Sequence, residues 1–366
     1  MSNEPNTVTL QETLKETEIP ANRQAHVPPI FVVGVWRSGT TLLYALLNQH
    51  PDIRLMYESD LPVLWPMFRI PWIRKTWVEK WECWNAGLTR HDLDAANLTG
   101  PVTSLADAME LAGRTYASEK GKKFWGCKSP SYYDRLVDLS REFPQARFVI
   151  IWRDPEEICD SVIRAAASGM WFARRGTPRK ALLASKILKQ QCEKLVARGA
   201  FVHQVHYRDL VEDTAGAMRS ICQFLQVPFT PAVTILEKAD RSAVFTGAHH
   251  KLAKGNQIIS RKARNEAVPP ALAAKIERYR ALWKSQAGDS WLLSQRFPAT
   301  GIKAGLWERA ADRFLFLMLR ARDISPRILF SILPMSVWQA YRRIKYKDEE
   351  QMRRQLTSKP TSLHGN

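Results

Sequence analysis

Residues 30–47 read IFVVGVWRSGTTLLYALL, a stretch that contains a strand pattern, a glycine loop and a helix pattern in succession. Ile30–Val33 is a short apolar run rich in β-branched residues, which is typical of a buried parallel strand. The leucines after the loop recur with helical spacing. A strand, a glycine loop and a helix in this order predict an anion-binding site, because the loop N–H groups and the positive end of the helix dipole point at one place.

The side chains of the loop strengthen this prediction. Arg37 adds a permanent positive charge with a planar set of donors, and Ser38, Thr40 and Thr41 add hydroxyl donors. The loop is close to the P-loop pattern G-x-x-x-x-G-K-[ST], with Gly39 as the second glycine and Thr40 in place of the lysine. Since that lysine binds the β- and γ-phosphates of a nucleoside triphosphate, we expect instead a ligand with a single 5′-phosphate that bears one reactive group.

The chain is strongly basic. Its 366 residues include 54 Lys and Arg against 36 Asp and Glu, a formal charge of +18, which favours acidic partners such as nucleic acid, an anionic membrane or an anionic small ligand. No dense lysine run, zinc-ligand spacing or RNP-like stretch occurs, so we expect no specific nucleic-acid binding. The five cysteines are scattered without a C-x-x-C, so we expect no metal site, no disulfide framework and a cytoplasmic setting with reduced thiols.

The pattern along the chain predicts one main domain with two extensions. Residues 1–26 are polar and lack the apolar region of a secretory signal, which indicates a disordered tail. Residues 27–300 would form an α/β domain, with a tryptophan-rich helical insertion over residues 61–120 near the acceptor site. Residues 301–366 would form a basic amphipathic helical extension and tail. Within it, residues 306–347 are candidates for peripheral contact with an anionic membrane, and packing on the domain or on a second subunit is the alternative.

Charged residues follow several of the other apolar runs that predict strands. These runs are Ile53–Met56, Phe124–Cys127, Arg147–Trp152 and Phe201–His206. Together with Ile30–Val33 they predict a central parallel sheet flanked by helices. In such a sheet, ligands bind beyond the carboxyl ends of the strands. Glu58, Lys128 and Arg153 are therefore predicted to lie at the functional edge.

Helix signals separate these runs. Residues 104–120 form an amphipathic pattern, and Ser129-Pro130 predicts the start of a helix that reaches about Phe143. Residues 180–198 and 215–225 predict two more helices.

The segment after the fourth strand predicts a second anion contact. Asp154 is a good N-cap, and Glu157 completes a pattern like a capping box. Ser161 follows two helical turns along. Arg153 and Ser161 could therefore hold a second phosphate.

Taken together, these stretches resemble the PAPS-dependent sulfotransferases, which use 3′-phosphoadenosine-5′-phosphosulfate, over roughly residues 28–290. Residues 34–41 are similar to the 5′-phosphosulfate loop of that family, and Arg153 with Ser161 is similar to its 3′-phosphate motif. Residues 207–211, YRDLV, look like its Y-E-D-L stretch. The resemblance implies a fold related to the nucleotide kinases.

The resemblance also implies the donor site. The residues implied are Arg37, Ser38, Gly39, Thr40 and Thr41 for the 5′-phosphosulfate, Arg153 and Ser161 for the 3′-phosphate, and Tyr207, Lys254, Gly255 and Asn256 for the rest of the nucleotide. The family often has another basic residue one helical turn after the serine of the 3′ motif, where this chain has Ala165. Arg164 or a residue of the loop 251–254 is expected to substitute.

The spacing from Arg37 through His50-Pro51 to Glu58 is similar to that of the tyrosylprotein sulfotransferases, and Lys128 matches the lysine that this group places near the leaving oxygen. Arg37 and Lys128 would then offset the charge that builds on the bridging oxygen. Our hypothesis is that Glu58 is the catalytic base, with His50 and Asp60 as rivals.

We therefore expect a sulfotransferase that moves the sulfuryl group of PAPS to a hydroxyl of a carbohydrate, lipid or small molecule, with PAP as product and no metal requirement. One alternative is a P-loop-type kinase of a small molecule, against which stand Thr40 and the lack of a clear Walker-B aspartate. The other is a basic protein that binds membranes or nucleic acid, which does not account for the paired 5′ and 3′ motifs. Homo-oligomerisation stays open.

Overall fold

A computed structural model of the chain describes residues 27–80, 104–154, 157–158, 161–162 and 178–236, and scattered residues between 306 and 340. A sheet with the strand order β2-β3-β1-β4-β5 lies at its centre, and every neighbouring pair is parallel. The strands are β1 (Ile30–Val33), β2 (Ile53–Tyr57), β3 (Phe124–Lys128), β4 (Arg147–Trp152) and β5 (Phe201–His206). The predicted α/β class and all five predicted strands are thus confirmed, and β2 and β3 each end one residue later than expected.

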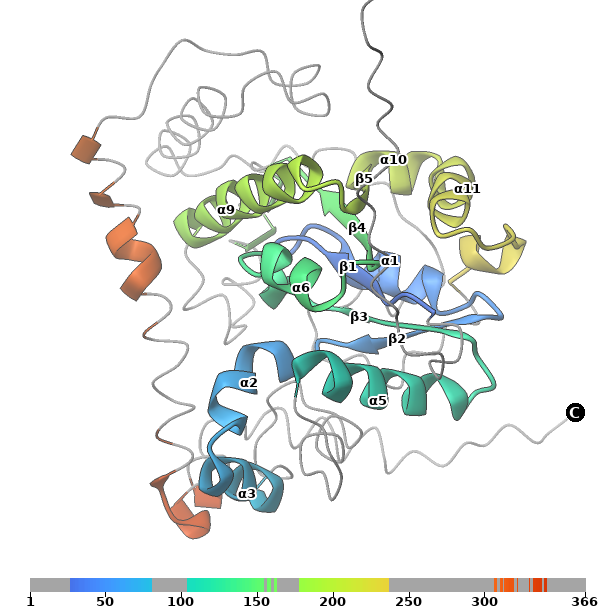
Figure 1. Ribbon diagram of the computed structural model, residues 1–366. Helices are drawn as coiled ribbons and strands as arrows, with labels where there is room; N and C mark the ends of the chain where they lie inside the picture. Colours follow the sequence, from blue (N-terminus) through green and yellow to red (C-terminus); the bar gives the residue numbers. More distant parts are fainter. Residues whose placement is uncertain are drawn as a thin grey trace, which may run out of the picture.

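Helices cover both faces of the sheet (Figure 1). One face carries α2 (Leu61–Phe68), α5 (Leu105–Ser118), α6 (Leu136–Glu142) and α9 (Pro178–Ala197), and α3 (Pro71–Lys80) follows α2. The other face carries α1 (Thr40–Leu47), α10 (Tyr207–Glu212), α11 (Thr214–Phe224) and the 3₁₀ turn η3 (Pro231–Thr234). Alternate residues of β1 enter the two layers, Phe31 and Val33 on the first face and Ile30 and Val32 on the second. Burial on both faces explains why this strand is a continuous apolar run.

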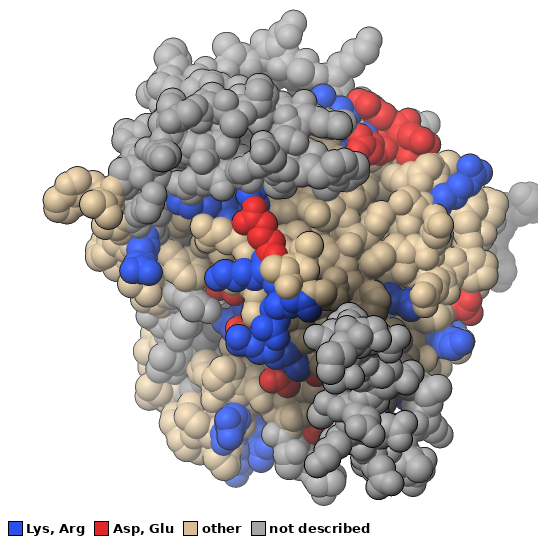
Figure 2. Space-filling view, turned by 45° about the horizontal axis from the view of Figure 1, so that its top comes forward, with Lys and Arg blue, Asp and Glu red and all other residues tan. Residues whose placement is uncertain are grey.

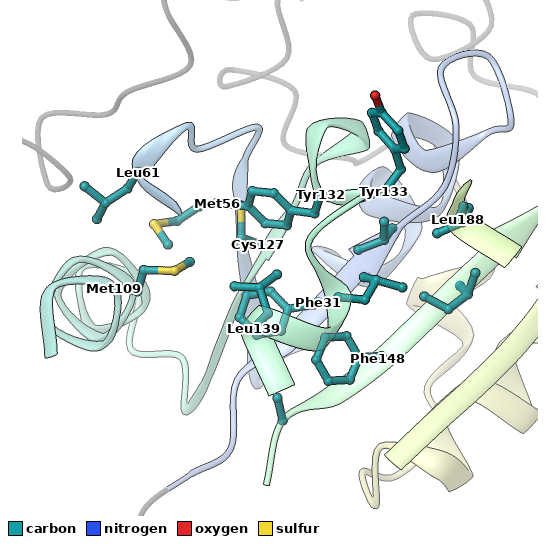
Figure 3. Close-up of a cluster of buried hydrophobic side chains, with 14 of the residues drawn as sticks. Phe31, Met56, Leu61, Met109, Cys127, Tyr132, Tyr133, Leu139, Phe148 and Leu188 are labelled. Atoms are coloured by element: carbon teal, nitrogen blue, oxygen red, sulfur yellow. The ribbon is translucent and has the colours of Figure 1, made fainter. Parts of the chain in front are cut away.

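The first layer contains aromatic rings that join neighbouring strands (Figure 3). The rings of Phe31 on β1 and Phe148 on β4 stack with their centroids 5.4 Å apart. Tyr132 is fully buried, and its hydroxyl donates to the carbonyl oxygen of Ser59 at 2.6 Å. A buried phenol needs such a partner. This bond ties the segment after β3 to the segment that leaves β2, directly beyond Glu58.

Several helices begin and end where the sequence predicted. Ser104 caps α5, because its hydroxyl accepts from the amide of Asp107 at 3.1 Å. The helices expected over residues 180–198 and 215–225 are α9 and α11, each shifted by no more than two residues.

The continuous helix expected from Ser129-Pro130 to about Phe143 is wrong. Ser129 caps only a 3₁₀ turn, η2 (Pro130–Tyr132), and α6 starts later, at Leu136. The adjacent rings of Tyr132 and Tyr133 make separate tertiary contacts, the first with Ser59 and the second with Trp36 at 5.3 Å between centroids. We infer that these contacts outweigh the local helix signal.

Some predictions fall outside the described residues. They concern the tail 1–26, the middle part of the insertion (81–103), the loop with Lys254, Gly255 and Asn256, and most of 301–366. Among the described residues near the C-terminus, Leu306, Trp307 and Phe314 are exposed, whereas Phe316 and Leu333 pack against the first core layer. The membrane contact of this segment stays a prediction. No helix in the described part of the chain is long and apolar enough to cross a bilayer.

The turn between α1 and β2 is held by one ammonium group. Lys122 Nζ donates to the carbonyl oxygens of Asn48 at 2.6 Å, His50 at 2.9 Å and Ile53 at 2.9 Å. An ammonium group has three N–H donors, so each N–H of Lys122 has a carbonyl partner. The contact fixes the start of β2, whose other end leads to Glu58.

Replacing Lys122 with Met should therefore lower the free energy of unfolding by about 2 kcal/mol, because three carbonyl groups lose a charged donor. The neighbouring Lys120 is exposed, so Lys120→Met is the matched control. It should change the free energy of unfolding by less than about 0.5 kcal/mol. Urea denaturation measures both. Equal effects of the two substitutions would show that the three bonds do not hold the turn.

Candidate active site

The loop after β1 folds tightly against the end of β4. A Cβ atom on Gly34 would lie 2.5 Å from Ser38 Oγ and 2.7 Å from the carbonyl oxygen of Ile151, so no larger residue fits there. Gly39 has a φ of 104° and is the N-cap of α1, which begins at Thr40. The loop thus has the strand, glycine turn and helix N-terminus that the sequence predicted.

Ser38 gives the clearest sign that this loop binds an anion. The residue is 1% exposed, and its hydroxyl oxygen has no hydrogen-bond partner among the described residues. An unpaired buried hydroxyl costs about 1–3 kcal/mol, and an anion bound in the loop would supply the missing partner. The first turn of α1 contains no acidic residue that would compete with an anion. The loop therefore fits a phosphate or phosphosulfate group.

Arg37 joins the loop to the second predicted phosphate motif. Its Nε donates to Ser161 Oγ at 2.9 Å, and its carbonyl oxygen accepts from an Nη of Arg153 at 2.9 Å. Its φ of 71° is in the left-handed region, which is uncommon for a residue other than glycine. The structure thus brings the two motifs, which lie 116 or more residues apart in the chain, into direct contact.

Lys128 and Glu58 form an ion pair beside the loop. Lys128 Nζ lies 2.6 Å from Glu58 Oε1 and donates to Thr41 Oγ1 at 3.3 Å. The Lys128 side chain is completely buried, whereas 39% of the Glu58 side chain is exposed. Burial lowers the pKa of Lys128, and the Glu58 carboxylate opposes that shift. The pair therefore places a buried cation and an accessible carboxylate at the first turn of α1.

Tyr57 is a site residue that sequence reasoning missed. Its ring centroid lies 3.7 Å from Lys128 Nζ, which is a close cation–π contact. Burial and the charge of Glu58 raise the pKa of the Tyr57 hydroxyl far above its usual range, so the phenol stays protonated. Tyr57 is paired in register with Lys128 across β2 and β3, but as the last residue of an apolar strand it gave no signal of its own.

Arg153 and Tyr207 stack at the far side of the loop. The Arg153 guanidinium carbon lies 4.1 Å from the centroid of the Tyr207 ring. The same ring covers Gly39, where an added Cβ atom would lie 2.4 Å from it. Both predicted donor-site residues, Arg153 and Tyr207, thus lie against the loop 34–41.

The two residues of the predicted capping box after β4, Asp154 and Glu157, also form ion pairs. The Glu157 carboxylate pairs with Arg153 and Arg208, and the Asp154 carboxylate pairs with Arg208. The backbone still turns into a helix here, since the amide of Ile158 donates to the carbonyl oxygen of Asp154 at 3.0 Å. The basic side chains nearby bind these carboxylates, which a local helix signal cannot reveal.

His50 does not lie at the predicted catalytic edge. It is buried before the start of β2, its Nε2 is 2.8 Å from the carbonyl oxygen of Pro228, and its Nδ1 accepts from the amide of Asp52. Of the three candidate bases, Glu58 is the one that contacts Lys128. Lys254, Gly255 and Asn256 lie outside the described residues. Within the described ranges, no group of three or more His, Cys, Asp and Glu residues could hold a metal ion.

Comparisons with known proteins show the family to which the chain is related. A family model described as "Sulfotransferase family" matches residues 28–231. Protein-tyrosine sulfotransferase A of Caenorhabditis elegans is 28% identical over 209 residues, which are 56% of this chain and 52% of that protein. The protein-tyrosine sulfotransferase of Drosophila melanogaster is 30% identical over 210 residues, which are 57% of this chain and 40% of that protein. The chain thus spans about half the length of the curated relatives it matches, or less.

Among solved structures, the "Sulfotransferase Domain from the Curacin Biosynthetic Pathway" matches with a TM-score of 0.44 and 20% identity, covering 70% of this chain and 97% of that one.

The environment of Tyr57 predicts a pH dependence of stability. Above pH 10 the unfolded chain loses this phenolic proton while the folded protein keeps it, so the folded state binds more protons and stability falls as pH rises. Above pH 10, the free energy of unfolding of the wild type should fall by up to about 1.4 kcal/mol per pH unit relative to that of Tyr57→Phe. Chemical denaturation of both proteins between pH 9 and 11 tests this, because the two proteins have all their other ionisable groups in common. Parallel profiles for the two proteins would contradict a phenol that stays protonated in the folded state.

Proposed function

The chain belongs to the sulfotransferase family, and we propose that it moves a sulfuryl group from PAPS to the hydroxyl of an acceptor. The observation that supports this best is the Lys128–Glu58 pair, which lies at the first turn of α1 beside an anion-binding loop. A carboxylate that can take a proton and a cation that can offset developing charge are the two groups that such a transfer needs.

The donor would be held by the loop 34–41 and the second phosphate motif, which contact each other through Arg37. In this proposal Arg37, Ser38, Gly39, Thr40 and Thr41 bind the 5′-phosphosulfate, and the unpaired Ser38 hydroxyl gains its partner there. Arg153 and Ser161 bind the 3′-phosphate, and Tyr207, Lys254, Gly255 and Asn256 complete the nucleotide site. When bound, PAPS supplies the activated sulfuryl group.

The protein residues would act mainly by position and charge. Glu58 accepts the proton of the acceptor hydroxyl, and its partial exposure leaves room for an acceptor to approach. Lys128 and Arg37 offset the negative charge that grows on the bridging oxygen of the donor. As in phosphoryl transfer, most of the rate enhancement would come from alignment and electrostatics.

The acceptor in this proposal is a carbohydrate, a lipid or a small molecule with a free hydroxyl. The relatives named protein-tyrosine sulfotransferases make a tyrosine peptide the main competitor. An acceptor screen should therefore include all four classes.

Donor binding can be tested before the acceptor is known. Without magnesium, PAP should raise the melting temperature of the protein and bind in calorimetry, whereas ATP should have little effect. Saturation at 100 times the dissociation constant would stabilise the fold by about 2.7 kcal/mol. A response to ATP that requires magnesium would instead favour a kinase. If neither nucleotide changes the melting temperature or binds, the proposed donor site is contradicted.

The role of Glu58 can be separated from donor binding. Glu58→Gln keeps the shape of the side chain but removes the base, so sulfuryl transfer to an acceptor found in the screen should fall by a factor of about 100 or more. PAP affinity should stay within about twofold of the wild type. Glu119→Gln is the matched control, because Glu119 also pairs with a cation, Arg54, but in a different part of the fold. Near-normal turnover of Glu58→Gln would exclude it as the base.

A further inference from the structure

Two carboxylates lie where the second phosphate would bind. Asp154 and Glu157 follow the predicted phosphate ligand Arg153 in the chain, and Glu157 Oε2 lies 2.9 Å from Arg153 Nε. The exposed fractions of the two acidic side chains are only 14% and 34%. Partly buried charges are weakly screened, so these carboxylates oppose the binding of a phosphate dianion beside them.

Arg208 contacts both of these carboxylates. Its Nη2 lies 3.2 Å from Asp154 Oδ2 and 2.9 Å from Glu157 Oε1. Glu157 therefore gives one oxygen to Arg208 and the other to Arg153. Acidic and basic side chains also intermingle on the face shown in Figure 2, so the excess of basic residues is not a uniform positive surface.

The local charge depends on Arg208. Arg153 and Arg208 carry two positive charges, and Asp154 and Glu157 carry two negative ones. Without Arg208 these four groups would lose one positive charge and carry a net charge of −1, and the nearby Arg37, whose Nε donates to Ser161, would be left to offset it.

We propose that Arg208 is a positioning residue for the second phosphate, and that it acts by neutralising Asp154 and Glu157 so that these carboxylates do not cancel the attraction of Arg153 for the anion. This inference rests on the proposed function, because it assumes a nucleotide with a 3′-phosphate. It predicts that the effect of Arg208 is specific to ligands that carry this phosphate and depends on the presence of Glu157.

Two ligands and three variants test the inference by calorimetry at low ionic strength. The ligands are PAP and adenosine 5′-monophosphate, which lacks the 3′-phosphate. Arg208→Gln should weaken PAP binding about tenfold, which equals about 1.4 kcal/mol, and leave adenosine 5′-monophosphate within about twofold. The double variant Arg208→Gln, Glu157→Gln restores the net charge, so PAP affinity should return to within about threefold of the wild type.

Arg141→Gln is the matched control. Arg141 pairs with Asp138 on the exposed surface of α6, just before β4 begins, so it lies near the opposite edge of the sheet. The substitution removes the same charge and should leave both affinities unchanged.

The outcomes separate the inference from the proposed function. A wild type that does not prefer PAP to adenosine 5′-monophosphate would overturn the donor site and the inference with it. A wild-type preference that survives in Arg208→Gln, or equal losses for both ligands, would overturn only the inference. Weak PAP binding that persists in the double variant would also overturn it, because Arg208 would then contact the phosphate directly.

Discussion

The site depends on one geometric constraint, which is that parallel strands present their carboxyl ends at the same edge of a sheet. Each of the five strands supplies a side chain near that end. β1 leads to Arg37, β2 to Glu58, β4 to Arg153 and β5 to Tyr207, and β3 ends with Lys128 itself. Because β1 lies between β3 and β4, the loop after it can contact residues from both halves of the sheet.

Two of these residues have unusual backbone angles that their own contacts hold. Arg37 and Glu58 both have positive φ, at 71° and 53°. The carbonyl oxygen of Arg37 is bound by Arg153, and the amide of Glu58 donates to the carbonyl oxygen of Lys128 at 2.6 Å. Conformations of this kind cost about 1–3 kcal/mol and persist where the surroundings fix them, commonly at functional sites. In both cases the partner that fixes the backbone is also a candidate site residue.

The sequence was sufficient for the strands and for much of the site, because buried parallel strands are continuous apolar runs and polar residues follow them directly. It was insufficient where a contact depends on strand order. Tyr57 matters because β3 brings Lys128 beside it, and Arg208 matters because β5 lies next to β4. The helix expected after Ser129 failed for the same reason, since Tyr132 bonds to a segment from β2. Local patterns contain no information about these neighbours.

The unequal exposure of Lys128 and Glu58 has a consequence for repeated turnover. A carboxylate that collects one proton in each cycle must release it before the next acceptor arrives. Because 39% of the Glu58 side chain is in contact with solvent, it can return the proton to bulk water without a relay. Lys128 has no such contact, and it can exchange protons only through neighbours such as Glu58 and Thr41. In the proposed reaction the carboxylate is therefore the member of the pair that solvent can reset directly.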